Sequence, residues 1–244
     1  MSRALAHTLV VAILAALLAV AFWRSGYAFQ WEGVWAYRQK FVSGWLTTVA
    51  MSLFSLVLSA LVGLVTAVGL RSRWPLVEAA ARVYVELIRG TPLLVQLLIG
   101  FYVVANAVGL ENRYVVGALV LALFSGAYMA EIFRGGLAAI PAGQRDAARA
   151  IGLTPWQSMR LVILPQAIRL VLPAVAGQLV SLIKDSSLLN VIGVAEYFYN
   201  TKNFISRSYA GLEGYVPLAF GYLILTIPVA GLAHWMEKRF RHET

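Results

Sequence analysis

Apolar stretches long enough to cross a lipid bilayer divide the chain, and no other feature restricts its fold as strongly. Hydrophobic residues make up 60% of the 244 residues and charged residues only 13%, which is typical of integral membrane proteins. Within hydrocarbon a backbone must satisfy its own hydrogen bonds, so such stretches are expected to be helices. We therefore predict an all-α integral membrane protein. Six transmembrane helices are expected, at residues 5–23, 45–70, 76–108, 114–133, 170–194 and 215–235.

The first apolar stretch, at residues 5–23, allows two interpretations. It is either a spanning helix or a secretory signal peptide, because Ala19-Val20-Ala21 resembles a cleavage site. The apolar run continues through Phe22 and Trp23, which favours an uncleaved helix. We assign residues 1–41 to this helix and an extracytoplasmic segment, and residues 42–240 to the main transmembrane domain.

Basic residues indicate the orientation of the chain. A net charge of +9 is compatible with nucleic-acid binding, but in membrane proteins Lys and Arg gather in cytoplasmic loops. If the polar segment 135–169 is cytoplasmic, thirteen of the 20 Lys and Arg residues lie on its side, six lie opposite, and Lys184 lies within a span. We predict that both termini are cytoplasmic and that nucleic acid is not a partner. The chain has no cysteine and only three scattered histidines, so no metal site is expected.

The segment at residues 135–169 is a polar, basic interruption of the apolar pattern. Gln144 to Ile151 suits a short helix that Gly152 ends in a left-handed conformation, and Thr154-Pro155 can start the next helix. A hairpin of this charge cannot lie in hydrocarbon and must project into water. Its four arginines in and after the short helix are Arg145, Arg149, Arg160 and Arg169.

This hairpin resembles the "EAA" loop of the membrane subunits of ABC importers. That loop has an acid followed by two alanines, a glycine six residues after the acid, and then a hydrophobic residue before Leu-Pro. Asp replaces the usual Glu here, and Val replaces the usual Ile. The matching residues are Asp146, Ala147, Ala148, Gly152, Val162, Leu164 and Pro165. The flanking segments 130–136, 164–167 and 184–188 are more specifically similar to the branch that transports polar amino acids such as histidine, glutamine, arginine and glutamate.

The resemblance covers roughly residues 42–240 and implies a five-helix core of the type I importer, here preceded by one extra helix. It implies that the short helix of the hairpin is a coupling helix docking into a separate cytoplasmic ATPase dimer. The implied coupling residues are Gln144, Asp146, Ala147, Ala148, Gly152, Leu164 and Pro165.

Further partners follow from the same resemblance. They are a second permease subunit, identical or sister, an extracytoplasmic amino-acid-binding protein, and the lipid of the bacterial cytoplasmic (inner) membrane. The sequence has no Gly-x-x-x-x-Gly-Lys-Ser/Thr phosphate loop. We therefore expect ATP and Mg²⁺ to be bound by the partner ATPase, and this chain to have no cofactor and no catalytic residue.

The stretch at residues 76–108 is too long for one simple span. Its 33 residues would form a helix of about 50 Å, against about 30 Å of hydrocarbon. Gly90-Thr91-Pro92 interrupts it, because proline lacks a backbone donor. Either the first half is an interfacial helix and Thr91 caps the real span, or a broken helix presents its N-terminus inside the protein, where free amides suit a carboxylate.

Ionisable residues at membrane depth usually belong to functional sites. The acids Glu131 and Asp185 suit the ammonium of an amino acid, and Thr91 or Lys184 suits its carboxylate. The alternative for the acids is structural ion pairing, since Arg134 follows Glu131 at helical spacing. Ser125 and Tyr128 share one side of a helix with Glu131. The predicted substrate-binding residues are Thr91, Ser125, Tyr128, Glu131, Lys184 and Asp185.

Together these features predict the permease subunit of an ATP-binding-cassette importer for polar amino acids. The alternative is a self-sufficient secondary transporter or channel that uses the intramembrane carboxylates as ion sites. The sequence shows no obvious inverted repeat, and a secondary transporter does not need a docking hairpin. An intramembrane enzyme lacks support, because no Ser/His pair or paired acids occur at hydrolase spacing.

Overall fold

The computed structural model describes residues 29–241 without interruption and, before them, only residues 5, 8–10, 12–13, 16–17, 19–20, 24 and 27. Every regular element in this part of the chain is a helix. The all-α fold class expected from the sequence is therefore confirmed. The first apolar stretch lies largely outside the described residues, so its span and its cleavage stay predictions.

The described residues contain four helices that are long and apolar enough to cross a membrane, or five spans if one bent pair counts as a span. The four are α2 (Trp31–Gly69), α5 (Arg113–Ala138), the helical run Pro155–Ile192 that contains α8 (Leu164–Asp185), and α10 (Gly211–Arg241). In the bent pair, α3 (Pro75–Gly90) meets α4 (Leu93–Leu98) and its continuation, the π-helix η1 (Ile99–Ala105), at 110°. The bend confirms the interruption expected at Gly90-Thr91-Pro92. The total of six spans stays a prediction.

Two segments that we expected to connect spans are helical. α2 begins at Trp31 rather than at residue 45. The polar segment before α10 forms α9 (Tyr197–Ser208), because the Glu196 side chain caps its first turn by accepting hydrogen bonds from the amides of Phe198 and Tyr199. Aromatic side chains of α9 and α2 then pack together around Phe41, Tyr197 and Phe204.

α5 is the central helix of the bundle. In its most apolar window 61% of the residues are buried, against 11% for α10. α5 packs against both α2 and α8, and α10 packs along α8. The core between these helices consists mainly of leucines, with Leu97, Leu121, Leu182 and Leu189 fully buried.

Small residues set the distance between α2 and α5. A Cβ added at Gly63 would overlap the Cβ of Met129 and lie 3.0 Å from the backbone nitrogen of Ala130. Because backbone atoms cannot turn aside as a side chain can, the two helices would have to separate. Gly177 in α8 is also helical, but a Cβ there would meet nothing within 4 Å.

We therefore expect Gly63→Ala to destabilise the bundle by about 1–3 kcal/mol, the usual cost of overpacking. The apparent melting temperature of the purified protein in detergent would fall. Gly177→Ala is the matched control, and it should leave the melting temperature unchanged or raise it, because alanine favours a helix more than glycine does. Equal melting temperatures for both variants would contradict the close approach of α2 and α5.

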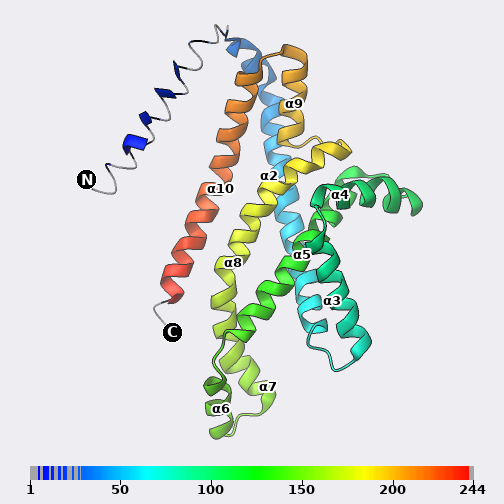
Figure 1. The fold of residues 1–244 in the computed structure, drawn as a ribbon, viewed down its shortest axis with the longest axis vertical. Helices are drawn as coiled ribbons and strands as arrows, with labels where there is room; N and C mark the ends of the chain where they lie inside the picture. The colour runs from blue at the N-terminus through cyan, green and yellow to red at the C-terminus, as the bar shows by residue number, and fades with distance from the viewer. Residues whose placement is uncertain are drawn as a thin grey trace.

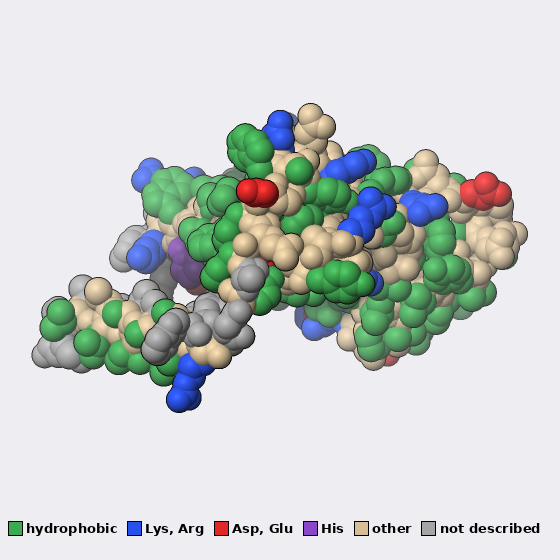
Figure 2. Space-filling view, turned by 90° about the horizontal axis from the view of Figure 1, so that it is seen from above, with side chains coloured by type: hydrophobic (Ala, Val, Ile, Leu, Met, Phe, Trp, Pro, Cys, Tyr) green, Lys and Arg blue, Asp and Glu red, His purple; other side chains and the backbone are tan. Residues whose placement is uncertain are grey.

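Different segments of the chain lie at the two ends of the bundle (Figure 1). The hairpin of α6 (Ala142–Ala150) and α7 (Pro155–Ser158), the turn between α2 and α3, and the end of α10 lie toward one end, and α9 with the start of α2 lies at the other. Figure 2 looks onto the α9 end and shows Lys and Arg side chains set among many hydrophobic ones. The hairpin, the α2–α3 turn and the C-terminal helix end are the segments expected to share the cytoplasmic side. The orientation itself stays a prediction.

Candidate functional sites: the polar hairpin and the interhelical carboxylates

The hairpin closes as the sequence pattern predicts. Gly152 has a φ of +84°, the left-handed conformation that glycine adopts at little cost. The Gly152 amide donates a 2.9 Å hydrogen bond to the carbonyl of Arg149, and the Leu153 amide donates a 3.0 Å hydrogen bond to the carbonyl of Ala148. This pair of bonds is the Schellman arrangement, which satisfies the last carbonyls of α6. Thr154 then caps α7 in a capping box with Gln157, and Pro155 occupies the first turn.

The alanines of the motif face different surroundings. Ala148 is buried, whereas Asp146 and Ala147 are exposed. Near the tip, no other part of the described chain covers two large apolar side chains. Ile151 is 77% exposed and Trp156 is 70% exposed. The hairpin therefore presents a polar helix beside apolar side chains.

Packing joins the hairpin to the bundle. Ile140 and Ile163 form a buried cluster with Ala167 of α8, packed against Leu137 at the end of α5. Between Met159 and Ile163 the chain forms the π-helix η2, which runs directly into α8 at Leu164. Pro165 lies just after η2 within this continuous helical run, and it lacks the backbone amide that a helix interior would use. Gln144 of α6 accepts a hydrogen bond from the side chain of Gln166 at 3.5 Å. Packing and this hydrogen bond thus connect the hairpin to α5 and α8.

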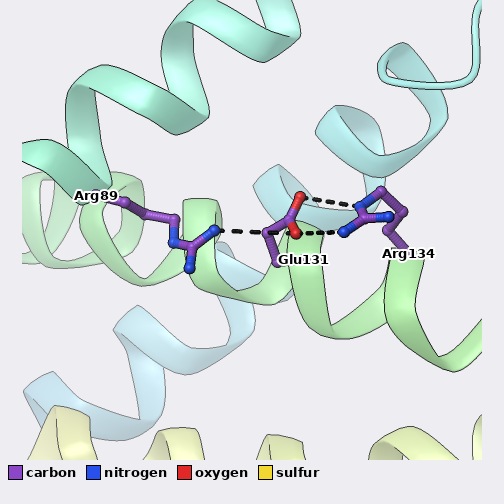
Figure 3. Close-up of polar contacts among 3 residues, drawn as sticks. All are labelled: Arg89, Glu131 and Arg134. Carbon is purple, nitrogen blue, oxygen red and sulfur yellow. Dashed lines mark hydrogen bonds and ion pairs between the residues drawn. The ribbon is translucent and has the colours of Figure 1, made fainter.

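Glu131 forms the ion pair that we considered as its structural alternative. Its carboxylate accepts hydrogen bonds from Arg134, at 3.1 Å from Nε and 2.7 Å from Nη2. Arg89 of α3 approaches from the other side, with Nη1 3.9 Å from Oε2, and Figure 3 shows Glu131 between the two arginines. The Arg89 guanidinium also lies over the ring of Tyr128 at 5.4 Å. Glu131 and Tyr128 thus link α5 to α3.

Thr91 lies at the break between α3 and α4, where its hydroxyl donates a 2.8 Å hydrogen bond back to the carbonyl of Leu87. Of the two alternatives for this break, the one in which Thr91 caps the later helix is wrong in that detail, because the residue before α4 is Pro92 and no side chain caps that helix. Gln96, which no pattern in the sequence marks as special, completes the break. Its side-chain amide donates to the hydroxyl and carbonyl of Thr91 and to the carbonyl of Ile88.

Ser125 lies in the contact between α5 and α8, and Asp185 is the last residue of α8. Ser125 is buried and accepts a 3.0 Å hydrogen bond from the side chain of Gln178. Asp185 ends α8, is partly buried, and has no hydrogen-bond or ion-pair partner within residues 29–241. The side chain of Lys184 is exposed. The next two hydroxyls, of Ser186 and Ser187, donate to carbonyls three residues back, where α8 tightens into the 3₁₀ helix η3 (Ser186–Ile192).

The structure does not bring Glu131 and Asp185 together. Gly136 of α5 lies against Val171 of α8, Ser125 against Gln178, and Gly117 against Leu189. The two helices are therefore antiparallel, and the two acids lie on opposite sides of the Ser125–Gln178 contact. At ~1.5 Å per residue they are separated by about 15–20 Å along the helix axes. One ammonium group cannot contact both acids of one chain, and the substrate-binding role of each stays a prediction.

Glu196 is a buried acid that the sequence pattern marks only as the start of a connection between spans. It lies between α2, α9 and α10, where the Tyr222 hydroxyl and the Thr48 hydroxyl are each 3.4 Å from Oε2. Burial raises the pKa of Glu196 to about 7, although its hydrogen bonds to the amides of Phe198 and Tyr199 act in the opposite direction. An acidic residue just before an aromatic helical segment is the signal that would have identified it.

A pH dependence of stability follows for Glu196. A carboxyl with a raised pKa binds its proton more tightly in the folded protein than in the unfolded chain, so its contribution favours folding at low pH. That contribution is lost as the pH rises from the ordinary value of 4.5 through about 7. We expect the apparent melting temperature to fall between pH 5 and 8, and to fall less in Glu196→Gln. The same slope in both proteins would assign the effect to other groups.

Apolar helices with a bent span and a polar helical hairpin define this chain as a multi-pass membrane protein. Residues 59–242 match the family described as binding-protein-dependent transport system inner membrane component, and the chain belongs to this family.

Three comparisons extend over most of the chain. The glutamine transport system permease protein GlnP of Escherichia coli is 32% identical over 215 residues, which cover 87% of this chain and 98% of that protein. A chain in the crystal structure of an amino acid ABC transporter with histidines superposes with a TM-score of 0.81 at 33% identity, covering 87% of this chain and all of that one. A chain of the methionine ABC transporter MetNI, in inward-facing conformations, has the same fold, with a TM-score of 0.66 at 21% identity over 81% of this chain.

Proposed function

We propose that this chain is the membrane-spanning permease subunit of an ATP-binding-cassette importer for polar amino acids in a bacterial cytoplasmic membrane. The hairpin carries the proposal, because it is a capped helical tip whose exposed apolar side chains Ile151 and Trp156 suit contact with a protein partner. The family and the likeness to amino-acid transporters support the same assignment.

In this proposal the hairpin couples ATP hydrolysis to the membrane helices. A cytoplasmic ATPase dimer would dock onto the coupling residues of the hairpin. The ATPase would also bind ATP and Mg²⁺, and this chain would take no part in ATP hydrolysis. The helical run from Pro155 to Ile192 connects the hairpin to Asp185 without a loop. A displacement of the hairpin would therefore move the far end of α8, as expected when rigid helices switch between two access states.

The remaining partners are assigned by the surfaces that the fold leaves uncovered. The apolar windows of α8 and α10 are only 17% and 11% buried, so lipid or a second permease subunit would cover them. An extracytoplasmic amino-acid-binding protein would meet the end that carries α9. Within the substrate path, Asp185 is the best candidate for the ammonium group, because it is the predicted acid that lacks a partner in the described chain.

The proposal is tested by purifying the tagged chain from its native membrane and identifying its partners by mass spectrometry. We expect an ATPase with a phosphate loop to co-purify, and amino-acid uptake into proteoliposomes to require ATP. Reporter fusions after Arg73, Gly152 and Arg241 should be cytoplasmic, and a fusion after Asn203 extracytoplasmic. Uptake by the chain alone, driven by an ion gradient without ATP, would instead establish the secondary-transporter alternative.

A further inference from the structure

A second basic feature lies where the hairpin meets the bundle, away from the exposed tip. A pocket of about 510 Å³ opens between the end of α2, the end of α5 and the start of α6. Three guanidinium groups and three small or apolar side chains line it. They are Arg71, Arg134, Arg145, Ala138, Ile140 and Ala142.

The positive charge of this pocket is incompletely paired. Arg134 is held by Glu131 at 2.7 Å, but neither Arg71 nor Arg145 has an acidic partner within residues 29–241. Arg145 makes one long hydrogen bond, from Nη2 to the carbonyl of Leu137 at 3.4 Å, and its buried Nε has no partner. A buried donor left unpaired costs free energy. The Nε atom itself is enclosed by the protein, but the Arg145 side chain lines the pocket with only one long hydrogen bond, so its guanidinium has donors available to an acceptor in the pocket.

The start of α6 adds to the same positive field. α6 begins at Ala142 on the wall of the pocket, with Pro141 before it, no side-chain cap and no acidic residue in its first turn. The amides at a helix start are unpaired and form the positive end of the helix dipole. Two guanidinium groups that no acid of the described chain neutralises, and an uncapped helix start, thus meet at one pocket.

We propose that this pocket binds the phosphate of an anionic phospholipid. Guanidinium groups match the geometry of phosphate oxygens, and basic pockets between membrane helices on the cytoplasmic side suit anionic headgroups. The pocket lies where the apolar helices α2 and α5 end, which is where headgroups would meet them in the proposed membrane orientation. Ala138, Ile140 and Ala142 offer apolar contacts to the rest of the lipid. The bound lipid would join α6 to α2 and α5. The inference rests on the proposed function only for placing this end at the inner leaflet.

The test uses the purified complex of the chain with its ATPase in a neutral detergent. The apparent melting temperature is followed while dioleoyl phosphatidylglycerol, dioleoyl phosphatidylcholine or sodium phosphate is added, and native mass spectrometry counts the retained lipid. We compare the wild type with Arg71→Gln, Arg145→Gln and the double variant. Lys238→Gln is the control, because it removes an exposed cation that does not line the pocket.

We expect phosphatidylglycerol to raise the melting temperature of the wild type and of Lys238→Gln, and the double variant to need at least tenfold more of it. The single variants should need amounts of phosphatidylglycerol between those of the wild type and the double variant. Phosphatidylcholine and millimolar phosphate should have no such effect. Equal responses to both lipids, the same lipid requirement in the double variant, or phosphate acting as well as phosphatidylglycerol would each overturn the proposal.

The same measurements, repeated on the chain purified without an ATPase, separate this inference from the proposed function. ATPase co-purification with an unchanged lipid response in the variants would refute the lipid site alone. A selective, arginine-dependent lipid response in a chain that binds no ATPase would support the lipid site and contradict the proposed function.

Discussion

Replacing Asp185 by asparagine is expected to weaken substrate binding ten- to a hundredfold while the bundle stays intact. The side chain ends α8, is partly buried and has no hydrogen-bond or ion-pair partner within residues 29–241. Asparagine keeps its shape and one acceptor but removes the charge that would attract an ammonium group. A hydrogen bond to a charged group contributes roughly 1.5–3 kcal/mol, which corresponds to the stated loss of affinity. The loss of affinity is measured as the shift in substrate concentration needed to stimulate the ATPase activity of the purified complex.

Glu131→Gln provides the comparison, because Glu131 already has partners. Its carboxylate holds Arg134 at 2.7 Å and lies 3.9 Å from Arg89, and both arginine side chains are about half exposed. The two cations would stay hydrated after the substitution, so the expected loss of stability is small, about 0–1 kcal/mol. Substrate affinity should change less than in Asp185→Asn. A lowered melting temperature with a normal substrate response in Asp185→Asn would instead assign Asp185 a structural role.

Features of this fold that depend on short-range rules could be predicted from the sequence. Gly152, Thr154 and Pro155 act on neighbouring backbone groups, so their order along the chain is sufficient to place the turn. The break at Pro92 is equally local, since proline lacks the donor that a continuous helix needs. The spans follow from length and hydropathy, because each must satisfy its backbone hydrogen bonds internally.

Features that depend on how helices pack could not be predicted in this way. The sequence places both Glu131 and Asp185 at membrane depth, but the distance between them depends on the antiparallel register of α5 and α8. Close contacts at Gly117 and Gly136 show this register. The role of Gln96 depends on the direction of the chain after the bend. The unpaired Nε of Arg145 becomes apparent only once α6 is folded against the bundle.

Gly152→Val is expected to uncouple the permease from its ATPase without unfolding the bundle. Gly152 holds φ at +84°, and a Cβ there would meet no atom within 4 Å. The cost of valine is therefore in the backbone alone, because a β-branched residue is strained in the left-handed region. The Schellman bonds to Ala148 and Arg149 would be lost, and with them the angle between α6 and α7. We expect a normal melting temperature, weakened ATPase co-purification and at least a tenfold loss of uptake.

Gly152→Asn separates backbone conformation from the loss of glycine itself. Asparagine also adds a side chain to the exposed tip, but it enters the left-handed region more readily than any β-branched residue. If the turn conformation positions the coupling helix, Gly152→Asn should keep most of the uptake and ATPase association that Gly152→Val loses. If both variants lose them equally, a side chain at the tip blocks docking and the conformation is not the cause. Normal uptake in Gly152→Val would argue against α6 as the coupling helix, because an altered angle at Gly152 moves every residue of α6 relative to α7.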